Sequence, residues 1–241
     1  MKYLIAISSC EAFESNGFNQ AMRDTWLADL SDPQFKDIDY RFFVGHGANG
    51  FGNTSEGYTK NDPRCKYDMV QVDCEDAYTH VTYKTQASLR WANEHGYDFV
   101  FRCFPDTYVR LDRLMACGFR DFDYYGDFRG SADWPGYASG GAGYWLSRKA
   151  YQRLLSAPIL GIGRDDIMMR VEDLWVGHSL PQQHATRFDD QRFKNTRDDC
   201  PSKDNDFVTA HLSYISCNGQ LKAELYNPTE MFAAHKPWRQ A

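Results

Sequence analysis

Short motifs that identify several large enzyme classes are absent from this sequence. It contains no P-loop, no GxSxG elbow and no HExxH pair. A P-loop cradles nucleotide phosphates, the elbow presents a serine nucleophile, and the two histidines of HExxH bind zinc. A P-loop kinase and a zinc metalloprotease therefore lose their main support.

Paired cysteines, long apolar runs and excess positive charge are also lacking. The seven cysteines are scattered and form no CxxC pair, so neither a zinc site nor a disulfide framework is indicated, and reduced thiols in the cytosol fit best. No stretch approaches the roughly 18 to 20 apolar residues that span a bilayer. The net charge of −6 disfavours a protein that follows nucleic-acid phosphates.

The opening segment, MKYLIAISSC, predicts a strand and not a targeting signal. It has one lysine and only a short apolar run before Ser8, which is too brief for a signal peptide. The sequence also has no terminal lipidation signal. We therefore expect an untargeted chain in the cytoplasm.

What the sequence does contain is an alternation of strand and helix patterns. Its 241 residues, 42% of them hydrophobic, can bury one large core, and no repeat or linker divides them. Strands are predicted at Tyr3–Ile7, Tyr40–Gly45, Asp68–Cys74, Tyr97–Phe104 and around Tyr124–Tyr125. Helices are predicted over Asn19–Leu30, with Asn19 as a cap, and over Asp76–Gly96, with Gly96 as a left-handed cap. This order predicts an α/β fold with a mostly parallel sheet covered on both faces.

Two further regions have loop-like composition. Residues Gly45–Tyr67 are rich in glycine and asparagine and predict a long loop, which at this length is more often functional or mobile than idle. Residues Asp189–Ala241 are rich in aspartate, asparagine and proline, and we expect loops plus an edge element there.

Four places could carry chemistry. Asp106 follows a predicted strand, where α/β proteins commonly bind ligands, although Pro105 could also end the strand for structural reasons. The glycines of YASGGAGYWLS would either let the backbone approach a ligand or form a tight turn. The adjacent acids Glu172 and Asp173 could form a base or an ion-binding pair, or could cap a helix. The late histidines, His211 and His235, could be ligands or structural residues.

Six segments in order resemble the β-1,3-galactosyltransferase-like family of inverting glycosyltransferases. They are AMRDTWL, RFFVG, DAYTHVTYKTQASLRWA, PDTYV, YASGGAGYWLS and EDLWVG. The resemblance covers roughly residues 1–180, and beyond RFDDQRF only HLS and HKPW match loosely. It implies the GT-A fold, a Rossmann-like, mostly parallel sheet with helices on both faces, as a single catalytic domain over residues 1–241. The nucleotide-binding part would be about residues 1–110 and the acceptor part about residues 111–241. Relatives in animal secretory compartments carry a membrane anchor ahead of this domain, so for a chain that begins at its first strand the resemblance implies a bacterial cell or a virus-infected host cell.

The resemblance also implies the reaction. A sugar would pass from a nucleotide donor, usually a UDP-sugar, to a hydroxyl of a glycan, a lipid-linked glycan or a protein, with inversion. Because negative charge grows on the departing diphosphate, family members generally stabilise it with Mn²⁺ or Mg²⁺ held by three consecutive acids. Here that motif reads Phe104, Pro105, Asp106. We expect one of two outcomes. Either the metal site is weakened, with Asp106 and the candidate ligand His211, or positive side chains replace the ion.

Further site residues follow from the same resemblance. It places Asp173 as the general base that deprotonates the acceptor, with Glu172 beside it. Tyr137 or Trp145 could offer a flat apolar face to an acceptor sugar. The donor side would include Asp106 and, beneath the sugar, Gly140 and Gly141. The donor side would also include three cations that could compensate for the missing acids by binding the diphosphate: Arg23, Lys84 and Arg102.

Two other functions stay open. The domain could be degenerate and bind a nucleotide sugar or a glycan without catalysis, which the loss of two motif acids favours and the retention of EDLWVG disfavours. A transferase that acts on modified bases of viral DNA is disfavoured by the negative net charge.

Overall fold

The computed structural model describes residues 1–46, 66–130, 136–159, 172–181, 185–196, 206–217, 220–223 and 227–239. Most of the loop predicted over Gly45–Tyr67 lies outside these residues, so that prediction stays untested.

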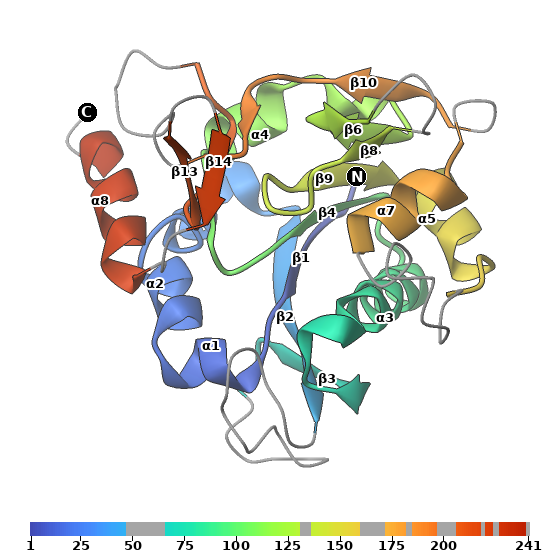
Figure 1. Cartoon of the computed structure of the whole chain (residues 1–241), viewed down its shortest axis with the longest axis horizontal. Coiled ribbons are helices and arrows are strands. Elements are labelled where there is room, and N and C mark those ends of the chain that lie inside the picture. The colour runs from blue at the N-terminus through green and yellow to red at the C-terminus, as the bar shows by residue number, and fades with distance from the viewer. Residues whose placement is uncertain are drawn as a thin grey trace.

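A seven-stranded sheet forms the centre of the described fold (Figure 1). Its spatial order is β10 (Arg187–Asp189), β6 (Tyr124–Gly126), β9 (Tyr144–Ser147), β4 (Phe99–Cys103), β1 (Tyr3–Ser8), β2 (Ile38–His46) and β3 (Met69–Glu75). Strand β9 runs antiparallel to β4 and β6, and the remaining neighbours are parallel. The mostly parallel sheet and the five predicted strands are confirmed.

The central strand β1 shows why the sheet is covered on both sides. All six of its residues are buried. Tyr3, Ile5 and Ile7 belong to one hydrophobic cluster, and Leu4 and Ala6 belong to the other. A strand buried on both faces reads as a continuous apolar run without alternation, which is what YLIAI provides.

Helices cover both faces of the sheet, as Figure 1 shows. One face carries α2 (Phe18–Asp24), α4 (Leu111–Ala116) and α8 (Pro228–Arg239), with the short α1 (Glu11–Ser15) before α2. The other face carries α3 (Val81–Glu94), α5 (Arg148–Leu155) and α7 (Glu172–Ser179). Gly96, with φ of +73°, follows α3 in the left-handed conformation that the sequence predicted.

The helix predicted over Asn19–Leu30 is shorter than expected. Helix α2 ends at Asp24, and Ala28–Ser31 forms a separate 3₁₀ turn, η1. The predicted cap, Asn19, lies inside α2 because Gly17 precedes the helix. The Asn19 side chain instead accepts a hydrogen bond from the Ser9 hydroxyl (2.8 Å), which ties α2 to the end of β1.

Small elements complete the fold. Three further 3₁₀ turns are η2 (Pro33–Phe35), η3 (Tyr78–His80) and η4 (Phe119–Asp121). A second sheet joins β11 (Phe193–Lys194), β12 (Thr209–His211) and β5 (Thr107–Val109). Two hairpins pair β13 (Tyr214–Cys217) with β14 (Gln220–Ala223), and β7 (Phe128–Arg129) with β8 (Tyr137–Ala138).

The prediction of loops plus an edge element for the C-terminal region is wrong for its last part. Helix α8 occupies Pro228–Arg239 and contacts α2 and β5. Met231, Ala234 and His235 are buried at helical spacing, although the surrounding aspartates, asparagines and prolines give the region a loop-like average composition. The buried stripe places α8 against the same face of the sheet as α2.

Candidate active site

A turn between β8 and β9 connects the two acids that the sequence singled out. The Gly140 N–H donates a hydrogen bond to Asp173 Oδ2 (3.2 Å). On the other side, a Cβ added at Gly141 would lie 2.1 Å from His211 Nδ1, so the histidine ring packs directly on that glycine. His211 Nε2 in turn lies 2.9 Å from Asp106 Oδ2. Asp106 and Asp173 therefore border one turn, residues Ser139–Gly141, which we call the glycine turn.

Asp106 stands between β4 and β5 as an anchored carboxylate. Its Oδ2 accepts hydrogen bonds from His211 Nε2 (2.9 Å) and from the Ser213 hydroxyl (2.6 Å). Burial alone would raise the pKa of Asp106, but the charge of His211 and these hydrogen bonds more than offset it and hold the pKa below its ordinary value. The carboxylate is therefore negatively charged at neutral pH.

The second oxygen of Asp106 is suited to a cation. Oδ1 is buried and has no hydrogen-bond partner among the described residues. A hard carboxylate oxygen is a ligand that Mn²⁺ accepts, so Asp106 could hold a divalent ion through Oδ1. His211 could join it only as a neutral imidazole that has given up its Nε2 contact with Asp106 Oδ2. The described residues contain no cluster of three or more acidic, histidine or cysteine side chains that would complete such a centre. The other ligands would have to come from the diphosphate and from water.

Glu172 and Asp173 form the first turn of α7 but differ in environment. The Glu172 carboxylate is buried, lies 3.0 Å from Arg102 Nη2 and accepts a hydrogen bond from the Tyr144 hydroxyl. Burial raises the pKa of Glu172 to about 8, although the Arg102 charge works against this shift. The Asp173 side chain is partly exposed. Burial also raises the pKa of Asp173, an effect that Gly140 N–H and Arg102 reduce. Asp173 is thus the more accessible acid, with increased proton affinity.

The three predicted diphosphate-binding cations are each already paired. Arg23 Nε and Nη2 donate to both oxygens of Asp68 (2.8 and 3.1 Å), and Arg23 Nη1 lies 2.9 Å from a Glu14 oxygen. The Lys84 ammonium donates to Asp76 (2.5 Å) and to a backbone carbonyl, and its side chain is buried.

Arg102 is buried against Glu172 in the same way. This arrangement does not support the prediction that the three cations bind a diphosphate directly, because each cation already contacts an acidic side chain, and Lys84 and Arg102 are buried.

Of the aromatic candidates, Trp145 is in the wrong place for an acceptor. It is 1% exposed, and its ring stacks on Phe119 with a centroid distance of 3.9 Å. The prediction that Trp145 contacts a sugar is therefore wrong. Tyr137 is partly exposed, packs against Gly177 of α7 and precedes the glycine turn. Burial, and next the Asp173 charge, raise the pKa of Tyr137, which places its hydroxyl within electrostatic reach of that acid.

The surroundings of His235 favour a structural role for this residue over a role as a ligand. It is buried in α8, and its Nδ1 lies 3.2 Å from the Tyr108 hydroxyl. The two late histidines thus have different roles, since His211 contacts Asp106 and His235 joins α8 to β5.

Several residues around the glycine turn were not predicted. Ser139 donates a hydrogen bond to Asn195, whose amide donates to the buried Asp127. Thr107 donates to the Gly141 carbonyl (2.9 Å). Ser213 donates a hydrogen bond to Asp106. It could have been predicted, because it lies two residues after His211 in the HLS segment. The partners of Ser139 come from distant segments, and no local pattern marks them.

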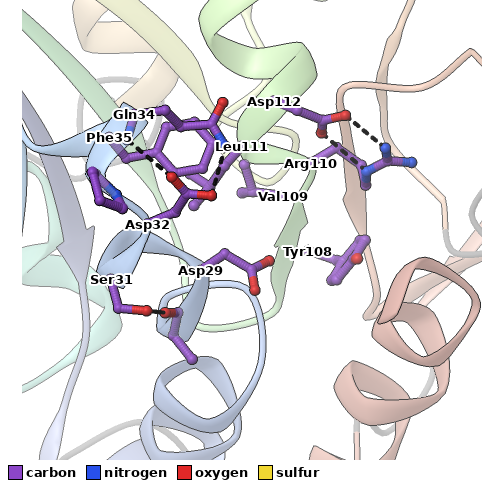
Figure 2. A pocket seen from close by; sticks show the side chains of 12 residues that line it. Asp29, Ser31, Asp32, Gln34, Phe35, Tyr108, Val109, Arg110, Leu111 and Asp112 are labelled. Carbon is purple, nitrogen blue, oxygen red and sulfur yellow. Dashed lines mark hydrogen bonds and ion pairs between the residues drawn. The ribbon is translucent and has the colours of Figure 1, made fainter. Parts of the chain in front are cut away.

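A separate cavity of about 630 Å³ lies between the η1–η2 segment and the start of α4 (Figure 2). Asp32 and Asp112 reach its rim, but Asp32 accepts hydrogen bonds from Gln34, and Asp112 pairs with Arg110 (2.8 Å). None of the residues that line it belongs to the glycine turn or to its two acids. The cavity is therefore distinct from the candidate active site.

Comparisons with known proteins bear on the fold. A family model described as Galactosyltransferase matches residues 19–123. No curated protein sequence matches the chain. The galactosyltransferase LgtC, solved with donor and acceptor sugar analogues, aligns over 98% of this chain and 96% of its own, with 12% identity and a TM-score of 0.50. A glycosyltransferase involved in glycosylation of the major capsid of PBCV-1 aligns over 98% of this chain and 100% of its own, with 9% identity and a TM-score of 0.53.

At these identities the solved structures establish the fold, which is the GT-A glycosyltransferase fold. The family match and the shared fold support the resemblance that the ordered motifs indicated. None of the described helices has both the length and the apolar character needed to span a bilayer.

Proposed function

We propose that this domain moves a sugar from a nucleotide sugar, with UDP as the expected nucleotide, to an acceptor hydroxyl with inversion. The acceptor would be a glycan, a lipid-linked glycan or a protein, and a β-1,3-galactosyl linkage is the first to test. The observation that carries the proposal is the placement of Asp106 and Asp173 on two sides of the glycine turn. One acid can serve the leaving group while the other serves the attacking hydroxyl.

For the attack, Asp173 acts as the general base. Its raised pKa increases its ability to take the hydroxyl proton while the acceptor oxygen bonds to the anomeric carbon. The Gly140 N–H holds Oδ2, and the Leu174 N–H donates to Oδ1 (2.9 Å). Attack from the face opposite the diphosphate gives inversion. Tyr137, beside this acid, is the proposed aromatic contact for the acceptor.

For departure of the diphosphate, Asp106 and His211 would hold Mn²⁺ or Mg²⁺. Such an ion supplies positive charge to the oxygens that become more negative in the transition state. The low pKa of Asp106 keeps this carboxylate available to a cation. Gly140 and Gly141 have no side chains, so the donor sugar could approach the turn closely. Because Phe104 and Pro105 replace two acids, we expect weaker ion binding than in relatives with three.

The proposal is tested by a panel of nucleotide sugars. A matched donor present at about 100 times its dissociation constant should stabilise the fold by about 2.7 kcal/mol, seen as a higher melting temperature. That donor should then give nucleoside diphosphate release in the presence of an acceptor, and proton NMR of the product should show an inverted anomeric centre. Absence of both stabilisation and release across the panel contradicts the proposal.

A binding domain without catalysis is the second candidate. It is favoured by Phe104 and Pro105 at two acid positions and by the lack of a three-ligand cluster among the described residues. Donor stabilisation without nucleoside diphosphate release over the whole acceptor panel would support this candidate. A cytoplasmic location stays a prediction, which fractionation of the native cells can check.

A further inference from the structure

Beneath Gly140 lies a buried pair of oppositely charged residue types. The Arg102 and Glu172 side chains are 0% and 2% exposed, and Arg102 Nη2 lies 3.0 Å from Glu172 Oε2. A Cβ added at Gly140 would lie 2.8 Å from Arg102 Nη1 and 2.9 Å from Glu172 Oε2. The pair therefore packs against the Gly140 backbone with no room for a side chain between them.

These contacts close a ring with the proposed base. Arg102 Nη1 donates a hydrogen bond to the Gly140 carbonyl (3.1 Å), and the Gly140 N–H donates to Asp173 Oδ2 (3.2 Å). Asp173 follows Glu172 along the chain, and Glu172 contacts Arg102 again. Arg102 thus holds the carbonyl of Gly140, and the N–H of the same residue donates to Asp173.

We propose that Arg102 and Glu172 are positioning residues that fix Gly140 so that its N–H orients the Asp173 carboxylate for proton transfer. This inference rests on the proposed function, in which Asp173 is the base. It gives both residues roles other than those expected from the sequence. Because the Arg102 and Glu172 side chains are both buried, Glu172 does not contact an acceptor and Arg102 does not bind a diphosphate.

Two further residues, outside this closed set of contacts, hold the Arg102–Glu172 pair in place. The Arg102 guanidinium carbon lies 3.6 Å from the centre of the Phe104 ring, a close cation–π stack. The Tyr144 hydroxyl donates to Glu172 Oε1. An acid at position 104, where relatives have the first residue of their acidic motif, would offer Arg102 a second carboxylate. Phenylalanine there covers the guanidinium, and Glu172 is the acidic side chain that contacts it.

Arg102 also affects the pKa of Asp173, the proposed base. The Arg102 charge lowers the pKa of Asp173, against the larger effect of burial. Among the residues that the structure describes, Glu172, Tyr124 and Tyr137 also interact electrostatically with Asp173. Removing the Arg102 charge should therefore raise the pKa of Asp173. The acidic limb of the pH profile of kcat would then move to higher pH, which a purely structural role would not cause.

Two variants of the full chain test the proposal with its matched donor and acceptor. Combining Arg102→Met with Glu172→Gln leaves no unpaired buried charge and so favours folding. We expect kcat to fall about 10- to 100-fold, because small misplacement of a catalytic group has effects of this size. The donor KM should stay close to that of the unaltered protein, and the acidic limb should move upward. Arg102→Lys keeps the charge, so kcat should fall while the limb stays in place.

The control is a similar cluster elsewhere in the fold. Asp190 pairs with Arg192 (2.7 Å) and accepts a hydrogen bond from the Tyr125 hydroxyl (2.5 Å). Arg192→Met combined with Asp190→Asn should leave kcat and its pH profile unchanged. Circular dichroism and the melting temperature establish that each variant is folded.

The outcomes separate the inference from the proposed function. If the unaltered protein releases nucleoside diphosphate and the folded double variant keeps its full kcat with an unmoved acidic limb, the positioning role is wrong while the proposed function stands. Full kcat in Arg102→Lys would also contradict the inference, and this variant decides the question if the double variant does not fold. If the unaltered protein shows no turnover with any donor, the proposed function fails and the inference fails with it.

Discussion

His211 packs so closely on Gly141 that a Cβ at the glycine would lie 2.1 Å from the histidine Nδ1. The same histidine contacts Asp106 through Nε2 at 2.9 Å. The glycine turn therefore sets the position of a side chain that touches the predicted metal-binding acid. Absence of a side chain at Gly141 is a structural requirement of this contact.

Gly141→Ala tests that relationship. The added methyl group must displace the His211 ring, so the ring should lose its contact with Asp106. We expect the apparent affinity for Mn²⁺ in the turnover assay to weaken about tenfold or more, the size of effect that loss of a partner of a metal ligand produces. Titration of Mn²⁺ into the unaltered and variant proteins measures it. Equal Mn²⁺ response in a folded variant would contradict the role of His211.

Asp173→Asn tests the base. The amide keeps the shape of the carboxylate but cannot take a proton, so turnover should fall at least about a hundredfold. Donor stabilisation in thermal unfolding should stay nearly intact, because Asp173 acts on the acceptor. Asp112→Asn is the control, since that carboxylate is exposed and borders the separate cavity. Unchanged turnover in Asp173→Asn would remove this residue from the mechanism.

The raised pKa of Glu172 predicts that the stability of the fold depends on pH. Its pKa is about 8 in the fold against 4.5 for the free group, so between these values the folded state binds more protons than the unfolded state. Its contribution to the free energy of unfolding should therefore decrease as the pH rises from about 4.5 to about 8. Urea unfolding of Glu172→Gln over this range should show a shallower decrease than the unaltered protein. Parallel curves for the two proteins would contradict the raised pKa.

Arg23→Met distinguishes a structural cation from a donor ligand. Removing this guanidinium leaves Asp68 buried without its bidentate partner, and Glu14 loses a partner as well. Loss of one member of a buried pair costs about 3 to 5 kcal/mol, which urea unfolding can measure. The melting-temperature increase on addition of donor should be the same as in the unaltered protein. A stable variant with a weakened donor response would instead restore the role predicted from sequence.

Local patterns predicted the elements that depend on local residues. The apolar run of β1 and the helical spacing that ends at Gly96 contain the information for those elements. Helix α8 was missed because its buried stripe lies within a stretch whose average composition is that of a loop. Asn19 was predicted to cap α2, but its side chain accepts a hydrogen bond from Ser9, next to the end of β1, and this contact is not visible in the local sequence.

Motif order indicated candidate site residues, but it could not indicate contacts between charged residues that are distant in the sequence. Asp106 and Asp173 were candidates because of their segments, and in the structure both border the glycine turn. The contact between Arg102 and Glu172 joins β4 to α7, so no local pattern reveals that this cation is buried beside an acidic side chain. Burial of Trp145 likewise depends on Phe119, which packs from another element.

A crystal structure with a matched nucleotide sugar and Mn²⁺ tests the central claim most directly. We predict the diphosphate beside Asp106 and His211, the sugar over Gly140 and Gly141, and the anomeric carbon open to an acceptor held by Asp173. A nucleotide sugar bound elsewhere, for example in the cavity of Figure 2, or a sugar turned away from Asp173, would contradict the account.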